Sequence, residues 1–134
     1  MILKGLEPGE LILLAARPGV GKTAFALAML NDISKQRKNT LFISLEMSRE
    51  ELTERMLIAK TGITRSTFYS QNNFTTEKFE ELEKAKEALD RQPIKIIDEA
   101  PRTFVEIREV IREEHRKKKL DLVILDYLSL ISLY

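Results

Sequence analysis

The sequence predicts a parallel α/β sheet covered by helices on both faces. Apolar runs that suit buried strands alternate with amphipathic helical patterns along the 134 residues. One apolar run stops at a glycine-containing loop ending in Gly-Lys-Thr, and a helical pattern follows directly. A later apolar run ends in an aspartate, Asp126. The alternation of strands and helices is that of parallel strands joined by right-handed crossovers.

The chain opens with a turn at residues 8–9 that leads into a strand predicted over residues 10–15. Four consecutive apolar residues in that strand do not alternate with polar ones, which suits a strand buried on both faces. A helix is expected over residues 22–38, where apolar residues recur at helical spacing. The second strand is predicted over residues 40–45, with Glu46 at its carboxyl end.

A capping box marks the next helix. Ser48 and Glu51 have the S-x-x-E spacing, which predicts a helix from there to about residue 60, with Gly62 as its stop. Residues 63–76 are rich in Ser, Thr and Asn, so we expect a surface connection there with at most a short helix.

The last part of the chain repeats the alternation. We expect a helix over residues 77–91, with Phe79 on its apolar face, and a short strand over residues 93–97. A second capping box predicts a helix over residues 103–118. The last strand is predicted over residues 120–126, and residues 127–134 are apolar with no obvious end.

Composition excludes several classes of function. With 22 Lys and Arg against 21 Asp and Glu, the net charge of +1 argues neither for nor against nucleic acid. The absence of cysteine excludes disulfides, zinc-thiolate sites and thiol catalysis. There is no signal-peptide pattern and no uncharged run of about 18 residues, so we expect a one-domain cytoplasmic protein without a membrane segment. The basic runs fall at predicted helix ends, where compensation of the helix dipole explains them better than DNA contact.

The Gly-Lys-Thr loop is a candidate phosphate site. It follows the P-loop pattern G-x-x-x-x-G-K-[ST], with Ala16 in the first position. Sharp turns at Gly19 and Gly21 would point backbone N–H groups into one concavity, at the positive end of the following helix. Lys22 would bridge the β- and γ-phosphates of ATP, and Thr23 would place its hydroxyl on Mg²⁺. The alternative is a turn that only resembles the pattern. The candidate nucleotide-binding residues are Arg17, Pro18, Gly19, Val20, Gly21, Lys22, Thr23 and Ala24.

Carboxylates follow the other predicted strands. Asp126 ends an apolar strand in the Walker B pattern, whose aspartate contacts Mg²⁺; alone the pattern is weak, but a P-loop about a hundred residues earlier strengthens it. Glu46 is the candidate catalytic base that would orient water toward the γ-phosphate, and the alternative is that it caps or flanks the helix beginning at Ser48. Asp98 and Glu99 fall on the same edge of the sheet, where we expect a solvated turn.

Three segments, residues 5–26, 42–48 and 122–128, resemble the RecA-like motor domain of the bacterial replicative DNA helicase family, DnaB. The resemblance implies a RecA-like P-loop ATPase that binds ATP or ADP with Mg²⁺ and unwinds DNA as an ATP-dependent helicase. It also implies a homo-hexamer that hydrolyses ATP at subunit interfaces and translocates on single-stranded DNA, with primase and a loader as possible partners. Glu46 would then activate water, with Lys22 beside it in catalysis.

The chain departs from the family pattern at two places. Gly19-Val20 replaces the usual Ser-Met, and Ser129 stands where Gln is usual. Residues 1–134 match only the amino half of the motor domain, truncated after the Walker B strand; the family's DNA-binding loops and arginine finger come later. An arginine finger is worth about 10³–10⁵ in rate, so this chain alone should hydrolyse ATP poorly.

The family's sheet also places a sensor strand between the P-loop strand and the Walker B strand. We expect this chain to close that gap by direct pairing, or to fill it with residues 128–134 or a neighbouring chain. Two alternatives to a helicase stay open: a nucleotide-dependent RecA-like switch or helicase-loader module without unwinding activity, and a folded fragment without function.

Overall fold

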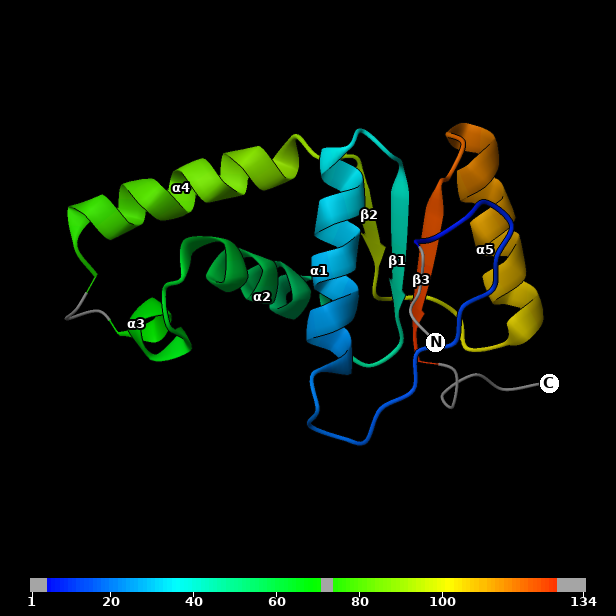
Figure 1. Cartoon of the computed structure of the whole chain (residues 1–134), viewed down its shortest axis with the longest axis horizontal. Helices are drawn as coiled ribbons and strands as arrows, with labels where there is room; N and C mark the ends of the chain where they lie inside the picture. The colour runs from blue at the N-terminus through cyan, green and yellow to red at the C-terminus, as the bar shows by residue number, and fades with distance from the viewer. Residues whose placement is uncertain (1–4, 71–73, 128–134) are drawn as a thin grey trace.

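The computed structural model describes residues 5–70 and 74–127. In this part of the chain, three parallel strands form one sheet in the order β2-β1-β3 (Figure 1). They are β1 (Thr40–Ser44), β2 (Ile94–Ile97) and β3 (Leu122–Asp126). The central strand β1 is buried along its whole length, because it has a strand on each side and helices packed on both of its faces. These strands confirm the predictions for the second, third and last strands, each slightly shorter than expected.

Helices flank the sheet at positions close to the predicted ones. They are α1 (Lys22–Lys35), α2 (Arg49–Thr61), α3 (Arg65–Tyr69), α4 (Thr76–Asp90) and α5 (Phe104–Lys117). The Ser48 side chain accepts the Glu51 N–H and Gly62 ends α2 with a φ of 68°, as the capping box and glycine predicted. Helix α1 ends before residue 38 because Arg37 has a φ of 63°, which a helix cannot continue.

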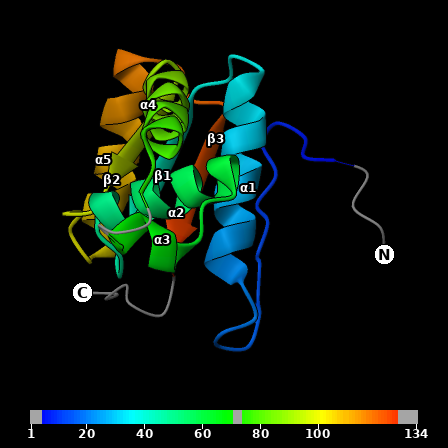
Figure 2. The ribbon, with the colours of Figure 1, turned by 90° about the vertical axis from the view of Figure 1, so that its left-hand side faces the viewer.

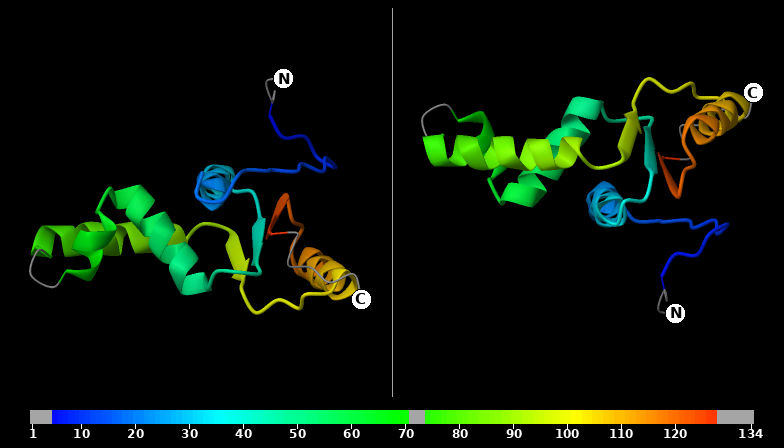
Figure 3. Two further views of the ribbon diagram at one scale, coloured as in Figure 1. Left: turned by 90° about the horizontal axis from the view of Figure 1, so that it is seen from below. Right: turned by 90° about the horizontal axis from the view of Figure 1, so that it is seen from above.

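The helices cover both faces of the sheet. On one face, α1 and α2 pack Leu30 and Leu52 against Phe42 of β1. On the other, α5 packs Ile107 against Leu41 and its neighbours. Figure 3 shows α1 and α5 on opposite sides of the strands, while α2, α3 and α4 extend beyond β2. None of the described helices is both long and apolar enough to cross a bilayer.

The predicted first strand is wrong for this structure. Residues 10–15 form no strand, and the side chains of Leu11 and Leu13 are 99% and 73% exposed. Figure 2 shows the segment running along α1, on the side away from the other helices. Figure 3 shows that it passes β3 on the same face of the sheet as α1. A strand needs a neighbour to pair its N–H and C=O groups, and among the described residues this segment has none.

Direct pairing across the expected gap is therefore absent from the described part of the chain, where β3 pairs only with β1. The two predictions on residues 128–134 and on Ser129 lie outside the described residues. Phe79, predicted on the apolar face of its helix, is half exposed, and so are Phe25 and Phe104. Each lies in the first turn of its helix, where fewer neighbours pack than at the middle of the sheet.

Candidate nucleotide-binding site

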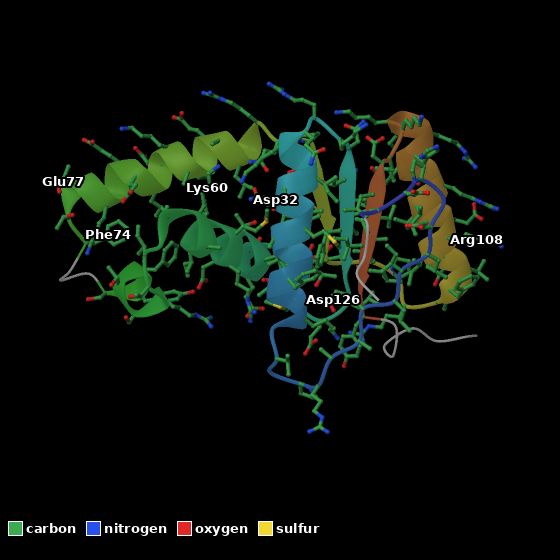
Figure 4. All side chains as sticks on the ribbon, viewed as in Figure 1. Asp32, Lys60, Phe74, Glu77, Arg108 and Asp126 are labelled. Carbon is green, nitrogen blue, oxygen red and sulfur yellow. The ribbon has the colours of Figure 1, made fainter. Side chains whose placement is uncertain are left out.

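The carboxyl ends of the strands and the start of α1 share one edge of the sheet, the lower edge in Figure 1. Figure 4 shows Asp126 at this end of β3, beside the first turn of α1. The parallel register places Ser44 of β1 next to Asp126. The edge therefore gathers the predicted phosphate loop, the end of β1 and the end of β3.

The loop before α1 has the backbone shape that the motif requires. Gly19 and Gly21 have φ angles of 78° and 100°, in the region that favours glycine. The Val20 N–H donates to the Arg17 carbonyl at 3.3 Å, which closes the turn that contains Pro18. A Cβ built on either glycine meets no atom within 4 Å, so conformation rather than crowding selects glycine at both positions.

The first turn of α1 leaves backbone donors available. Gly21 is the N-cap residue, and within the described residues no side chain caps this end of the helix. The Gly21 carbonyl accepts the Phe25 N–H at 2.9 Å, so the regular helix begins at Lys22, and Ala24 lies exposed in its first turn. Unpaired N–H groups and the positive end of the helix dipole favour an anion such as phosphate.

Side chains of the loop and of β3 contact one another. The Thr23 hydroxyl donates to Asp126 Oδ2 at 2.9 Å, although the two residues are 103 positions apart. Lys22 Nζ lies 3.9 Å from Asp126 Oδ1. The structure thus brings together the hydroxyl, the ammonium and the carboxylate that the two motifs predicted.

Tyr127 adds a contact that sequence reasoning missed. Lys22 Nζ lies over its ring, 4.5 Å from the centroid. An ammonium near an aromatic face is attracted by the ring quadrupole. The motif names the lysine but carries no signal for this neighbour, because Tyr127 simply follows the Walker B aspartate.

Glu46 lies exposed in the loop that follows β1. Within the described residues its carboxylate has no hydrogen-bond or ion-pair partner, and it does not cap α2. That helix is capped instead by Ser48, and the Arg49 N–H donates to Asp98. The loop is tied to β3 because the Leu45 N–H donates to the Asp126 carbonyl at 2.8 Å.

Residues 98–99 form a bend in which Glu99 is exposed, as expected, but Asp98 departs from the expectation of a solvated side chain. Its Oδ2 accepts the Arg49 N–H at 2.7 Å, and its Oδ1 lies 3.8 Å from Arg49 Nη2. The hydrogen bond from the Arg49 backbone is the main reason why the pKa of this carboxyl is lowered from its ordinary value. A hollow of about 460 Å³ lies beside it, lined by Arg49, Glu50, Ile97, Asp98 and Glu99, on the β2 side of the edge.

The donor set fits magnesium better than a metal that needs several protein ligands. Hydroxyl and carboxylate oxygens are hard ligands, and Mg²⁺ usually takes one or two carboxylates together with water and phosphate oxygens. Thr23 and Asp126 offer such a pair. Elsewhere in residues 5–70 and 74–127, no cluster of three His, Cys, Asp or Glu side chains could hold a metal.

Comparison with known proteins identifies the family. The family model described as "DnaB-like helicase C terminal domain" matches residues 1–133. The chain belongs to this family. The DnaB-like resemblance inferred from the P-loop, residues 42–48 and the Walker B segment is thereby confirmed.

Curated relatives agree with the assignment. The chain is 38% identical over 137 residues to the replicative DNA helicase DnaB of Mycoplasma genitalium, covering 98% of the chain and 28% of that protein. It is 36% identical over 129 residues to the replicative DNA helicase DnaC of Bacillus subtilis, with 96% and 28% covered. The chain thus spans little more than a quarter of the length of these relatives.

Two solved structures share the fold. One is an ATPase domain that superposes with a TM-score of 0.79 at 28% identity, covering 87% of this chain and 42% of that one. The other, a DnaB-like replicative helicase studied with its primase interactions, gives 0.78 at 28% identity, with 87% and 29% covered. The predicted RecA-like α/β architecture, a parallel sheet with helices on both faces, is confirmed.

Proposed function

We propose that the chain is the ATP-binding part of a replicative DNA helicase motor, and that the helicase hydrolyses ATP at this site with Mg²⁺. The observation that carries the proposal is the 2.9 Å hydrogen bond from the Thr23 hydroxyl to Asp126 Oδ2. It joins the residue that ends the P-loop to the residue that ends the Walker B strand. Family membership, with relatives named replicative DNA helicases, supports the same function.

Each residue of the site has a role that follows from its position. The N–H groups of the glycine loop and of the first turn of α1, including that of Ala24, would hold phosphate oxygens. Lys22 would place a positive charge on the β- and γ-phosphates. Thr23 and Asp126 would hold Mg²⁺, which supplies charge neutralisation at the phosphates when it is bound.

Glu46 is the proposed general base. Its carboxylate is exposed and carries no ion pair in the described structure, so it is available to accept a proton from water. Its loop is hydrogen-bonded to the backbone of Asp126, which keeps the base and the metal-binding carboxylate on one edge. The side chains that accept N–H groups at the start of α2 are those of Ser48 and Asp98, which weakens the alternative that Glu46 serves as the helix cap.

Lys22 is engaged by other groups in this structure. It lies near the Asp126 carboxylate and over the Tyr127 ring, with 31% of its side chain exposed. Phosphate oxygens would compete with these partners for the same ammonium. Binding of nucleotide would therefore separate Lys22 from Asp126 and free that carboxylate for the metal.

The activities of the whole helicase are part of the proposal. We propose a homo-hexamer that translocates on single-stranded DNA through segments other than those described here, and that works with a loader and a primase. The solved DnaB-like helicase studied with its primase interactions supports the last partner. By themselves these 134 residues would bind nucleotide but hydrolyse it slowly, because the arginine finger that a neighbouring subunit would offer contributes much of the rate.

Titration with ATP and Mg²⁺ tests the site directly. Lys22→Ala should abolish nucleotide binding, because it removes the positive charge at the phosphates. Lys38→Ala is the matched control, since Lys38 is an exposed lysine at the amino edge of the sheet, and it should bind as the parent does. Equal affinity in the parent and in Lys22→Ala would rule out the proposed site.

A further inference from the structure

We propose that Asp98 is a positioning residue for Glu46, which it holds in place through the first turn of α2. The inference rests on the proposed function, in which Glu46 is the base. Asp98 contacts neither the phosphate loop nor Asp126 in the described structure, and it follows β2 rather than β3. Its effect would therefore reach the reaction through the loop that carries Glu46.

The loop that carries Glu46 is short and is fixed by its backbone. Only Leu45, Glu46 and Met47 separate the end of β1 from Ser48, the N-cap of α2. The Leu45 N–H donates to the Asp126 carbonyl at 2.8 Å, and the Met47 N–H donates to Ser44 Oγ at 3.0 Å. The Glu46 side chain has no partner among the described residues, so its position depends on the two ends of this loop.

Asp98 fixes the far end of the loop to the sheet. The Arg49 N–H donates to Asp98 Oδ2 at 2.7 Å, and Arg49 is the first residue of α2. Asp98 comes directly after Ile97, which is paired with Ile43 of β1. The start of α2 is therefore attached to the sheet through β2. The other end of the loop continues directly from β1 of the same sheet.

Electrostatics strengthen this attachment. The Asp98 side chain is 18% exposed, whereas its partner Arg49 is 60% exposed. The carboxylate faces the amino end of α2, where the helix dipole favours a negative charge. A carboxylate that accepts a backbone N–H at such a point makes a charge-assisted hydrogen bond, which is stronger than a neutral one.

The geometry separates an effect on catalysis from an effect on nucleotide binding. Strand β1 lies between β2, which carries Asp98, and β3, which carries Asp126. Removal of the Asp98 carboxylate should loosen the start of α2 and move Glu46 relative to the reacting water. It should leave Lys22 and Thr23 in place, because they contact Asp126.

The test compares kcat with nucleotide affinity in the protein expressed from its complete reading frame. Asp98→Ala should lower kcat for ATP hydrolysis about tenfold, because a misplaced catalytic group costs rate steeply. KM and the Kd for ATP should stay within about twofold. Asp98→Asn keeps an acceptor oxygen for the Arg49 N–H and should restore most of the lost rate.

Asp121→Ala is the matched control. Asp121 Oδ2 accepts the Asn39 N–H at 2.8 Å, a bond of the same kind at the opposite edge of the sheet. Its loss should leave kcat unchanged even where it lowers thermal stability. Equal losses of kcat in Asp98→Ala and Asp121→Ala would show a general structural effect and would overturn the inference.

Glu46→Gln in the same assay separates the inference from the proposed function. Loss of kcat in Glu46→Gln with a parental kcat in Asp98→Ala overturns the positioning role and leaves Glu46 as the base. A parental kcat in Glu46→Gln overturns the proposed base, and the positioning role with it.

Where Asp98→Ala does not fold, Asp98→Glu decides, because it moves the carboxylate by one methylene. A lower kcat at unchanged Kd supports the inference, and a parental kcat contradicts it.

Discussion

Two apolar runs in this chain differ in burial: one is buried in the sheet and the other is exposed. Leu41, Phe42 and Ile43 in β1 are fully buried, whereas Leu11 and Leu13 are 99% and 73% exposed. Both runs meet the criteria for a buried strand, yet only the first has a strand on each side. The comparison shows that an apolar run predicts what a segment can bury, while its neighbours decide whether it becomes a strand.

The physical reason lies in the backbone as much as in the side chains. Each strand residue carries an N–H and a C=O that need partners when water is excluded. Thr40 to Ile43 exchange these bonds with β2 and β3 in a parallel register. The segment over residues 10–15 pairs with no strand among the described residues, and its leucines stay exposed.

Truncation of one side chain from each apolar run should affect stability very differently. Phe42→Ala should lower the free energy of unfolding by about 3–5 kcal/mol, because it removes a fully buried ring and leaves a cavity. Leu11→Ala should change it by no more than about 0.5 kcal/mol, because that side chain contacts solvent. Urea denaturation measures both. A large loss in Leu11→Ala would show that the leading segment is buried after all.

An ion pair between α5 and β2 should have a smaller effect on stability. Glu114 of α5 pairs with Lys95 of β2 at 2.6 Å, and the hydrogen bond from Lys95, followed by that from Lys117, lowers the pKa of Glu114 from its ordinary value of 4.5. A lowered pKa in the folded state means that the stability contributed by this group is present above pH 4.5 and is lost as the pH falls through the folded value.

Acid denaturation checks the sign. The urea concentration at the unfolding midpoint of the parent should decrease as the pH is lowered from about 7 to about 3. In Glu114→Gln this decrease should be smaller. Both partners sit on elements of the packed region, which is why the pair is held in place. An identical fall in the parent and in Glu114→Gln would show that this ion pair contributes nothing to the acid dependence.

Local signals predicted most of the fold. Ser48 and Gly62 mark the two ends of α2 with chemistry that does not depend on distant contacts, so both could be read from the sequence. The strand over residues 10–15 could not be judged in the same way, because pairing depends on which strands lie beside it. No local pattern contains that information.

In the candidate site, too, local motifs predicted some residues, while a contact that depends on strand order was missed. The P-loop pattern and the aspartate after an apolar run named Lys22, Thr23 and Asp126, and the structure brings these side chains together. The contact between Asp98 and the start of α2 was missed, because it requires that β2 lie next to β1, which the sequence does not state. The catalytic role of Glu46 stays a prediction.

The proposed site requires that the amino end of α1 and the carboxyl ends of β1 and β3 converge on one triphosphate and metal. Paramagnetic relaxation by Mn²⁺, added with ATP in place of Mg²⁺ to isotope-labelled protein, measures this convergence. The amide resonances of Thr23, Glu46 and Asp126 should all broaden, while those of Asn39 and Asp121 at the opposite edge should stay sharp. Broadening that spares Glu46 or Asp126, or that reaches Asn39 equally, would contradict a shared site at the ends of these three elements.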